Sequence, residues 1–358
     1  MNITWTASKL EHAVCDRLWF YENLYAGRRE IPFNKPIVVG IFLHNMAEKF
    51  WVRDMKTGLI KPRYKSNETF VNAIRGRFKH DIINKGEIQE KRIQWKDEEE
   101  KWKALGEVIN ISRKFWDKSI DEYSRGYFPL LIEQPFMFRI NGISFKGRID
   151  DIRSDPSGKY LFIIRDHKSG RRYPRHMELE YKSQFTLYVL GIGCLVHEDK
   201  KFADILGISD EERMKLAGNP TYLDDRINVE YHHMRADMSE EWIFSTTRGD
   251  AHYHDFISMV TDIDERIRRR IEGKGVLYPS DFPPNRQHCD YCYASGICDA
   301  HTKGKMKPHM TLMDNNLDLQ LESDGGLVVK DTELKTIRAS KKPLKRKNRR
   351  QQTLDFEG

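Results

Sequence analysis

The chain has 358 residues, 39% of them hydrophobic, and its 61 Lys or Arg against 54 Asp or Glu give a net charge of +7. This length allows one large domain or two, and the hydrophobic content is sufficient for a packed core. No stretch approaches the ~20 apolar residues that a membrane-spanning helix needs, and the N-terminus lacks the basic-then-apolar order of a signal peptide, so we expect a cytoplasmic protein.

The excess of basic residues lies near the C-terminus. Residues 335–350 contain nine Lys or Arg and no acid, so the rest of the chain carries a net charge of −2, which is +7 less nine. From residue 303 onward the composition is polar with little periodicity, which predicts a folded domain over 1–302 and a flexible basic tail over 303–358. Five cysteines, an odd number, argue against a disulfide framework and favour metal-bound or free thiols.

Two helices are predicted near the N-terminus. The first spans 7–25 and places Cys15 among apolar residues at helical spacing, where a lone cysteine is most simply a small core residue. The second spans 41–55 and carries His44 and Glu48 one turn apart on one face. Without partners elsewhere in the chain, this pair is most simply part of a polar stripe.

Residues 60–126 are polar and rich in Lys, Glu and Trp, with apolar residues at helical spacing, so we predict a helical insertion or subdomain. Charged helices with interleaved aromatic residues could bind nucleic acid, although solvated helix faces explain the same pattern. A first strand is predicted over 130–140.

A β-hairpin is predicted over 147–168. Two apolar, β-rich runs flank the tetrad 155–158, Asp-Pro-Ser-Gly, whose Pro and Gly suit a type I turn. Paired positions in such a hairpin have a nearly constant sum, which places Asp150 and Asp166 close together on neighbouring strands. Because strand side chains alternate, Asp166 and Lys168 project from the same face.

Two carboxylates and an ammonium on an otherwise apolar sheet require an explanation, because buried charges are costly. A divalent cation supplies one, since hard oxygen ligands suit Mg²⁺ or Mn²⁺ and a lysine can help to position or activate a water molecule. The plainer alternative is a surface hairpin with solvated charges.

The loop after the hairpin is basic and follows the predicted metal site directly. We therefore expect contact with a phosphate backbone from Arg171, Arg172 and Arg175. A helix predicted over about 177–196 then carries Gln184 and Tyr188 one turn apart.

Cys194 lies in the apolar end of that helix, and we interpret it as buried core. The segment 198–228 is predicted to be an irregular helical insertion. A strand over 227–234 follows, and then a helix over 255–272 that Gly273 would cap.

Three cysteines, Cys289, Cys292 and Cys298, stand within ten residues of one another. A tetrahedral zinc or an iron-sulfur cluster takes four protein ligands, and Cys15 is the available fourth. The unequal spacing with a remote cysteine favours a [4Fe-4S] cluster, while zinc completed by His288 or His301 remains the alternative. Either would tie the N-terminal helix to the end of the domain and close a loop of roughly 270 residues.

Taken together, these motifs resemble the RecB-like branch of the PD-(D/E)XK nucleases, particularly its iron-sulfur members, the AddB nuclease domain and the CRISPR-associated RecB-like exonucleases. The resemblance covers most of the chain, and its motifs occur in the family's order. They are Gly40-x3-His44-x3-Glu48, Gly147-Arg-Ile-Asp150, Asp166-His-Lys168, Gln184-x3-Tyr188 and the cysteine set.

The resemblance implies an α/β fold with a restriction-endonuclease-like core, in which helices flank a central mixed sheet, with added helical insertions. It implies that His44, Asp150 and Asp166 bind a catalytic Mg²⁺ or Mn²⁺ and that Lys168 orients or helps to deprotonate the attacking water. Gln184 and Tyr188 would shape the site and contact DNA.

Three further acids lie in or beside these motifs. Glu48 is interpreted as a supporting group, and Glu133 as an acid behind the metal ligands. Asp151 stands beside Asp150 and competes for the inward position, but the register of the motif favours Asp150.

The function implied is a metal-dependent DNA exonuclease that acts on single-stranded ends, 5′ to 3′, in repair, recombination or phage replication. A structure-specific or single-strand endonuclease is an alternative, as is a non-catalytic DNA-binding factor that recruits a sliding clamp. Gln351, Leu354 and Phe356 match the Q-x-x-L-x-F pattern of clamp-binding peptides. The basic run before them more simply binds DNA or RNA without sequence preference.

Overall fold

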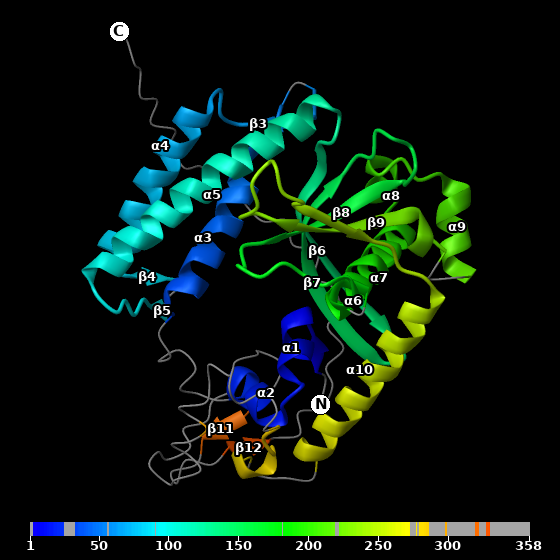
Figure 1. Cartoon of the computed structure of the whole chain (residues 1–358). Helices are drawn as coiled ribbons and strands as arrows, with labels where there is room; N and C mark the ends of the chain where they lie inside the picture. Colours follow the sequence, from blue (N-terminus) through cyan, green and yellow to red (C-terminus); the bar gives the residue numbers. More distant parts are fainter. Residues whose placement is uncertain are drawn as a thin grey trace, which may run out of the picture.

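A mixed β-sheet forms the centre of the molecule, with helices on both of its faces (Figure 1). The computed structural model describes residues 3–24, 33–55, 57–89, 91–180, 182–218, 222–272, 277, 279–285, 298, 319–321 and 327–329. The predictions for Gly273, Cys289, Cys292, and the clamp-binding peptide fall outside these residues, as do those for His288 and His301. In the described part of the chain, no helix is both long and apolar enough to cross a membrane.

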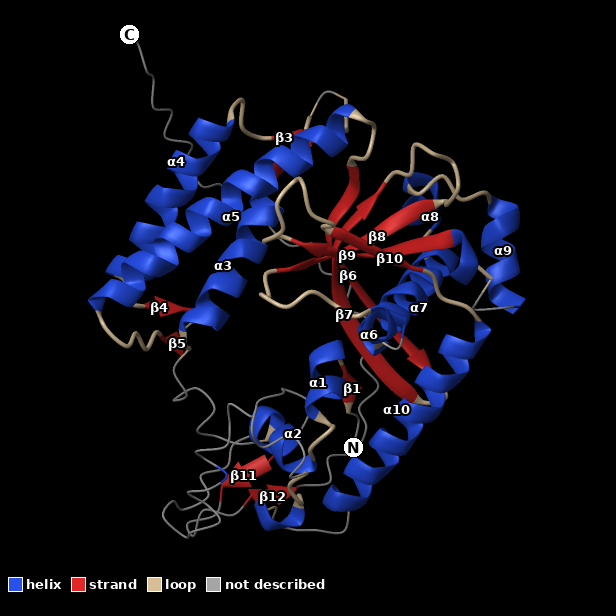
Figure 2. Ribbon diagram, in the orientation of Figure 1, coloured by secondary structure: helices blue, strands red, loops and turns tan. Residues whose placement is uncertain are grey.

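Strand β7 pairs with three other strands of the sheet and has partners along both of its edges (Figure 2). Strand β6 runs antiparallel along one edge, and on the other edge β1 pairs in parallel with the first half and β8 antiparallel with the second half. Strand β9 then pairs in parallel with β8, and β10 antiparallel with β9. The predicted mixed sheet flanked by helices is therefore confirmed. The strands are β1 (Thr4–Trp5), β6 (Pro129–Ile140), β7 (Ile143–Arg153), β8 (Phe162–Lys168), β9 (Ile227–His233) and β10 (Ile243–Thr246).

The main hydrophobic core lies on one face of this sheet. There α7 and α10 cover apolar side chains from β6, β7, β8 and β9, and α1, α2, α8 and α9 pack around them. The helices are α1 (Ala7–His12), α2 (Asp16–Asn23), α6 (His176–Glu180), α7 (Ser183–Glu198), α8 (Lys200–Ile205), α9 (Asp210–Gly218) and α10 (Asp250–Ile271). Cys194, predicted as buried core, is only partly buried at the edge of this cluster.

A second core belongs to α3, α4 and α5, which stand together beside the sheet (Figure 1). Phe50 lies at its centre, with the rings of Phe70, Phe115 and Trp116 packed edge-on around it at centroid distances of 5.1 to 5.4 Å. The elements are α3 (Lys35–Phe50), α4 (Asn67–Phe78), α5 (Glu98–Ser124), a π-helical turn (Lys79–Asn84), and the strand pairs β2 (Trp51–Arg53) with β3 (Ile60–Pro62) and β4 (Glu87–Ile88) with β5 (Lys91–Arg92).

Several predicted helix boundaries were wrong, and capping residues explain two of the differences. The predicted helix 41–55 begins at Lys35, because Asn34 Oδ1 accepts the backbone N–H of Ile37 and Pro36 suits a first turn, and it ends at Phe50. The predicted helix 7–25 is two helices. Ala13 ends α1, and Cys15 is in an extended conformation as the N-cap of α2.

Three other predicted segments also differ in detail. The helix 177–196 is divided into α6 and α7, and the helix 255–272 begins earlier, at Asp250. The irregular segment 198–228 contains α8 and α9 and a short 3-10 helix (Asp224–Arg226). A second 3-10 helix (Pro279–Asp281) and the strands β11 (Leu319–Leu321) and β12 (Leu327–Val329) complete the described elements.

Candidate active site

The predicted hairpin is present, formed by β7 and β8. Its three recorded pairs, Asp151 with Arg165, Ile152 with Ile164, and Arg153 with Ile163, share one register, in which Asp150 falls opposite Asp166. The turn is closed by the N–H of Gly158, which donates to the carbonyl of Asp155 at 3.2 Å. Gly158 has φ = 68°, the left-handed conformation that glycine adopts without strain.

Asp166, Lys168 and Gln184 meet on the face of the sheet that α7 covers. Lys168 Nζ lies 3.0 Å from Asp166 Oδ1 and 2.8 Å from Oδ2, and it donates to Gln184 Oε1 at 3.3 Å. Gln184 Nε2 in turn donates to Asp166 Oδ1 at 3.2 Å and to the hydroxyl of Tyr188 at 2.5 Å. One turn of α7 therefore holds the lysine and the carboxylate of β8 in place.

Asp150 and His44 complete the group from β7 and α3. His44 Nδ1 lies 3.5 Å from Asp150 Oδ2, which also accepts the backbone N–H of His167 at 2.7 Å. The structure therefore brings together the six side chains that the sequence predicted for this site, which are His44, Asp150, Asp166, Lys168, Gln184 and Tyr188.

The pKa values of the site show how its charges interact. Burial and the nearby charge of Asp166 raise the pKa of Asp150 well above the ordinary value. Burial alone would lower the pKa of Lys168, but Asp166 and Asp150 raise it, so the side chain is an ammonium at neutral pH. Burial, together with the charges of His167 and Lys168, lowers the pKa of His44 to about 4, and its imidazole is neutral and can serve as a ligand.

The donor set fits a hard divalent cation. Asp166 Oδ2 is buried and, although near Lys168, has no hydrogen bond of good geometry among the described residues. The pKa of Asp150 is raised by burial and by the neighbouring charge of Asp166, both of which a bound cation would offset. No three His, Cys, Asp or Glu side chains of the described residues converge as a finished cage. Mg²⁺ does not require one, because it commonly binds through one or two carboxylates and completes its shell with water and substrate phosphate.

The neighbouring acids take different places. Asp151 points to the opposite face of the sheet, where it accepts from Arg153 Nε at 2.9 Å. Glu133 lies 3.2 Å from Arg148 Nη1 and contributes to the raised pKa of Asp150, after larger contributions from burial and Asp166. Glu48 is exposed, one turn beyond His44.

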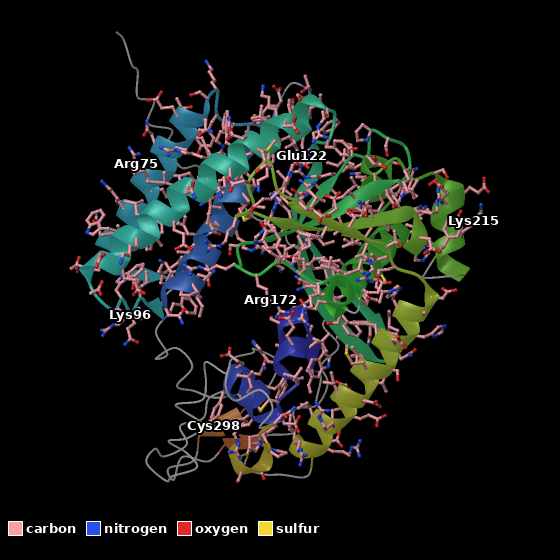
Figure 3. All side chains as sticks on the ribbon, viewed as in Figure 1. Arg75, Lys96, Glu122, Arg172, Lys215 and Cys298 are labelled. Carbon is pink, nitrogen blue, oxygen red and sulfur yellow. The ribbon has the colours of Figure 1, made fainter. Side chains whose placement is uncertain are left out.

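A buried ionic cluster on that opposite face was missed by sequence reasoning. Arg165 lies between Glu122 of α5 and Glu230 of β9, with Nη1 at 2.6 Å from Glu122 Oε2 and Nη2 at 2.5 Å from Glu230 Oε2. Arg153 Nη1 reaches Glu122 at 2.9 Å, and Asp151 belongs to the same group. In Figure 3, Glu122 stands where α5 meets the sheet. Where the two strands pair, Asp150, Asp166 and Lys168 face the site, and the residues that alternate with them, Asp151, Arg165 and His167, face this cluster.

Two histidines extend the cluster behind the site. His167, which separates Asp166 from Lys168, has Nδ1 at 2.7 Å from His232 Nδ1 and Nε2 at 3.2 Å from Asp151 Oδ2. Burial lowers the pKa of both histidines, and most strongly that of His232. The sequence signal for this arrangement is the alternation of side-chain direction in a strand, which puts Arg165 and His167 on the face opposite Asp166 and Lys168.

A second lysine near the site was also missed. Lys182 is the N-cap residue of α7, two residues before Gln184, and its pKa is lowered by burial and by the charge of Lys168. The predicted phosphate-binding arginines lie in the exposed loop after β8. Arg172 and Arg175 pair with Glu178, and Arg171 pairs with Glu107 of α5.

The N-terminal cysteine contacts the chain a few residues before the three other predicted cysteine ligands. Cys15 Sγ accepts the backbone N–H of Asn285 at 3.3 Å, and Asn285 Nδ2 donates to the carbonyl of Val14. Arg17 of α2 donates to the carbonyl of Phe282 and lies 3.8 Å from the sulfur of Cys298. Figure 3 labels Cys298. Cys15 therefore contacts Asn285, and Cys298 contacts Arg17, which is two residues after Cys15.

Comparison with known proteins gives one family match. The model of the PD-(D/E)XK nuclease superfamily matches residues 4–299. Among curated proteins, none matches the chain.

Two solved structures are similar to the chain at low identity. One, described as "Putative exonuclease" from Eubacterium rectale, is 11% identical, with 82% of this chain and 87% of that chain covered and a TM-score of 0.39. The other, described as SSO0001, is 14% identical, with 82% and 93% covered and a TM-score of 0.28.

Proposed function

The chain belongs to the PD-(D/E)XK nuclease superfamily, and from that premise we propose that it is a Mg²⁺- or Mn²⁺-dependent deoxyribonuclease that degrades single-stranded DNA from its ends, 5′ to 3′. The observation that carries the proposal is the convergence of Asp150, Asp166 and Lys168 on one face of the hairpin. Two carboxylates that can bind a metal ion, and an ammonium that can stabilise phosphate charge, suit metal-dependent phosphodiester hydrolysis.

Asp150, Asp166 and His44 would hold the metal ion. When bound, the ion lowers the pKa of a coordinated water and neutralises charge on the scissile phosphate. Lys168 is an ammonium at neutral pH because its pKa is raised, so it orients the water and stabilises the developing phosphate charge rather than removing a proton. Gln184 keeps Lys168 and Asp166 at a fixed separation through its two hydrogen bonds.

The test uses single-stranded oligonucleotides labelled at either end, with Mg²⁺ or Mn²⁺. Asp166→Ala and Lys168→Ala should each lower the rate by roughly 10²-fold or more. Lys159→Ala is the matched control, because Lys159 is a lysine of the same hairpin that lies beside Tyr160, away from the site. Wild-type protein that leaves DNA intact, or Asp166→Ala with full activity, would contradict the proposal.

The same assay separates the alternatives in direction and mode of cleavage. A 5′ to 3′ exonuclease releases short products first from the 5′ label and leaves covalently closed single-stranded circles intact. Cleavage of the circles would identify the endonuclease alternative. An RNA oligonucleotide of the same sequence tests the choice of DNA.

We also infer a [4Fe-4S] cluster held by Cys15, Cys289, Cys292 and Cys298. The contacts of Cys15 with Asn285 and of Arg17 with Cys298 support this proposal, because they bring the remote cysteine to the segment that precedes the other three. Anaerobically purified protein should be brown and contain iron and sulfide. Cys15→Ser should lose the visible absorption and Cys194→Ser should keep it. Colourless protein with stoichiometric zinc would instead establish the zinc alternative.

Clamp recruitment through Gln351, Leu354 and Phe356 remains a separate prediction. Deletion of residues 351–358 should abolish binding to a sliding clamp while leaving cleavage of short oligonucleotides unchanged. A purely recruiting, non-catalytic protein would bind the clamp and DNA without hydrolysing DNA.

A further inference from the structure

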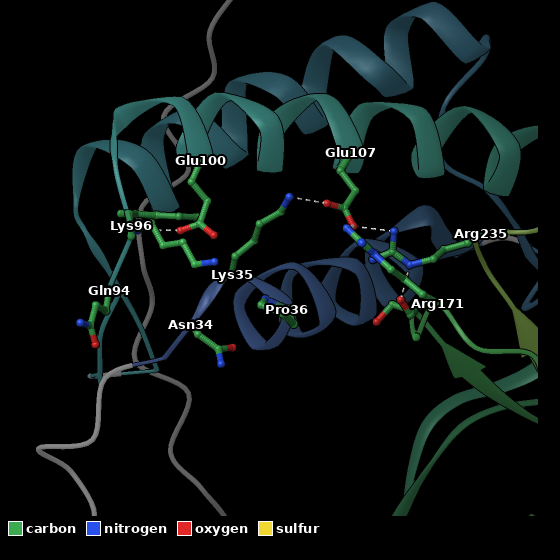
Figure 4. Close-up of a pocket in the computed structure, with 12 residues that line it drawn as sticks. Asn34, Lys35, Pro36, Gln94, Lys96, Glu100, Glu107, Arg171 and Arg235 are labelled. Carbon is green, nitrogen blue, oxygen red and sulfur yellow. Dashed lines mark hydrogen bonds and ion pairs between the residues drawn. The ribbon is translucent and has the colours of Figure 1, made fainter. Parts of the chain in front are cut away.

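A cavity of about 700 Å³ lies beside the loop that follows Lys168 (Figure 4). Its walls come from the start of α3, the segment before α5, α5 itself, and the loop after β8. Its charged lining residues are Lys35, Lys96, Glu100, Glu107, Arg171 and Arg235. Four cations against two acids make this lining basic.

Helix α3 and the loop after β8 each contribute residues to the cavity and lie next to residues of the active site. Lys35 and His44 stand on the same helix nine residues apart, a distance of about 13 Å along its axis. Between them, a Cβ added at Gly40 would lie 3.2 Å from Ser169 Oγ, so helix and loop are in close contact there. Ser169 itself lines the cavity and follows Lys168 directly in the sequence.

Three cations from three elements surround one carboxylate in this cavity. Glu107 Oε2 lies 2.9 Å from Lys35 Nζ, and Oε1 lies 2.5 Å from Arg235 Nη1 and 3.8 Å from Arg171 Nη2 (Figure 4). We call Lys35, Arg171 and Arg235 the cation cradle. With Glu107 included, the group keeps a net charge of +2.

The cradle is held in a fixed shape. Arg235 Nε donates to the carbonyl of Ser169 at 2.5 Å, and Lys114 Nζ donates to the carbonyl of Arg235 at 3.0 Å. Burial alone would raise the pKa of Glu107, but Lys35 and Arg235 lower it, so its carboxylate is ionised. An oxyanion therefore already occupies the centre of the cradle, and arginine and lysine donors that fit a carboxylate also fit a phosphate.

We propose that the cation cradle binds a backbone phosphate of the substrate strand, a few nucleotides from the scissile phosphate. This inference rests on the proposed nuclease function. The excess positive charge attracts the phosphate, and Glu107 limits that attraction and keeps the cations in position while the site is empty of DNA. The strand would then run along α3 between the cradle and the active site.

The proposal predicts opposite effects for two neutralising substitutions. Glu107→Gln removes the competing carboxylate and should tighten binding of a single-stranded 12-mer by about threefold or more, because the cradle gains one net positive charge. Lys35→Gln should weaken binding by about tenfold. It should also reduce the slope of log K against log salt by roughly 0.7, the value for one lost phosphate contact.

Binding is measured with a fluorescent oligo-dT 12-mer and 3-mer in EDTA, which prevents hydrolysis, over a series of salt concentrations. Arg171→Gln provides a second variant, since this side chain is 78% exposed and its loss should leave the fold intact. Lys103→Gln is the matched control, an exposed lysine on the same helix as Glu107 that pairs with Glu99. The 3-mer carries too few phosphates to reach both places, so its affinity should respond less to these changes than the affinity of the 12-mer.

Three outcomes would overturn the inference. If Glu107→Gln and Lys35→Gln both lower the unfolding midpoint and both weaken binding, the group is a structural ion cluster. If neither variant changes the 12-mer affinity while wild-type protein cleaves DNA, the cradle is rejected and the nuclease proposal stands. If inorganic phosphate at millimolar concentration binds the wild type but not Lys35→Gln, and both proteins bind the 12-mer with the same affinity, the ligand of the cradle is free phosphate. If the wild-type protein neither binds nor cleaves DNA, the proposed nuclease function is wrong, and the proposal for the cradle fails with it.

Discussion

Replacing Gly191 by alanine should destabilise the protein and disturb the active site. A Cβ at this position of α7 would lie 2.6 Å from Cδ2 and 2.7 Å from Cγ of Phe136, well inside the 3.5 to 4.0 Å of a normal carbon contact. The ring cannot retreat toward β7, because a Cβ at Gly147 would be 2.3 Å from its Cζ. Phe136 therefore fills a slot whose two walls are glycines.

The magnitude follows from two opposing terms. Overpacking of this kind costs up to about 3 kcal/mol, while alanine in place of glycine inside a helix gains about 1 kcal/mol. We expect Gly191→Ala to lose about 2 kcal/mol of unfolding free energy. Gly106 of α5 is the matched control, since nothing lies within 4 Å of its added Cβ, and Gly106→Ala should gain about 1 kcal/mol.

The assay is urea unfolding followed by circular dichroism, combined with DNA cleavage. Gly191→Ala should also lower activity, because α7 carries Gln184, whose bonds to Asp166 and Lys168 are 3.2 and 3.3 Å long, and a shift of α7 would break them. Adding Phe136→Leu should restore part of both losses. Equal midpoints for Gly191→Ala and Gly106→Ala, or no recovery with Phe136→Leu, would refute the reasoning.

Three further predictions concern the groups around the site. Arg165→Met should lower the unfolding free energy by about 3 to 5 kcal/mol, because buried Glu230 loses its arginine partner and buried Glu122 keeps only Arg153 of its two, and the urea midpoint measures this loss. The free energy of unfolding should fall as the pH drops below about 6.5, because His232 is protonated in the unfolded chain but resists protonation in the folded one. Between pH 7 and 5, the thermal unfolding midpoint of His232→Gln should therefore change less with pH than that of the wild type. Tyr188→Phe removes the hydroxyl that accepts a hydrogen bond from Gln184, and it should lower kcat about tenfold with little change in KM. A tenfold rise in KM at unchanged kcat would instead assign the tyrosine to substrate binding.

The sequence by itself determined the local features of this protein. The alternation of Asp150, Asp166 and Lys168, the turn residues between the strands and the helical spacing of Gln184 and Tyr188 placed these side chains correctly relative to their own elements. These features depend on residues within about twenty positions of each other, for which strand and helix periodicity is a sufficient guide. Helix ends were less well predicted where capping residues ended or began a helix earlier than the apolar pattern suggested.

Only the tertiary structure decided what lies behind and beside the site. In the sequence, Glu122, Arg165 and Glu107 look like ordinary solvated charges, because composition does not show which charged residues are buried. Their partners are distant in the sequence, as with Arg165 and Glu230 at a separation of 65 residues, so packing alone brings them together. The same applies to Phe136, whose slot exists because a strand and a helix approach closely at Gly147 and Gly191. The placement of Asp150, Asp166 and Lys168 on one face was therefore predictable from short-range pattern, whereas the approach of His44, the cluster behind the site and the basic cavity follow from long-range packing.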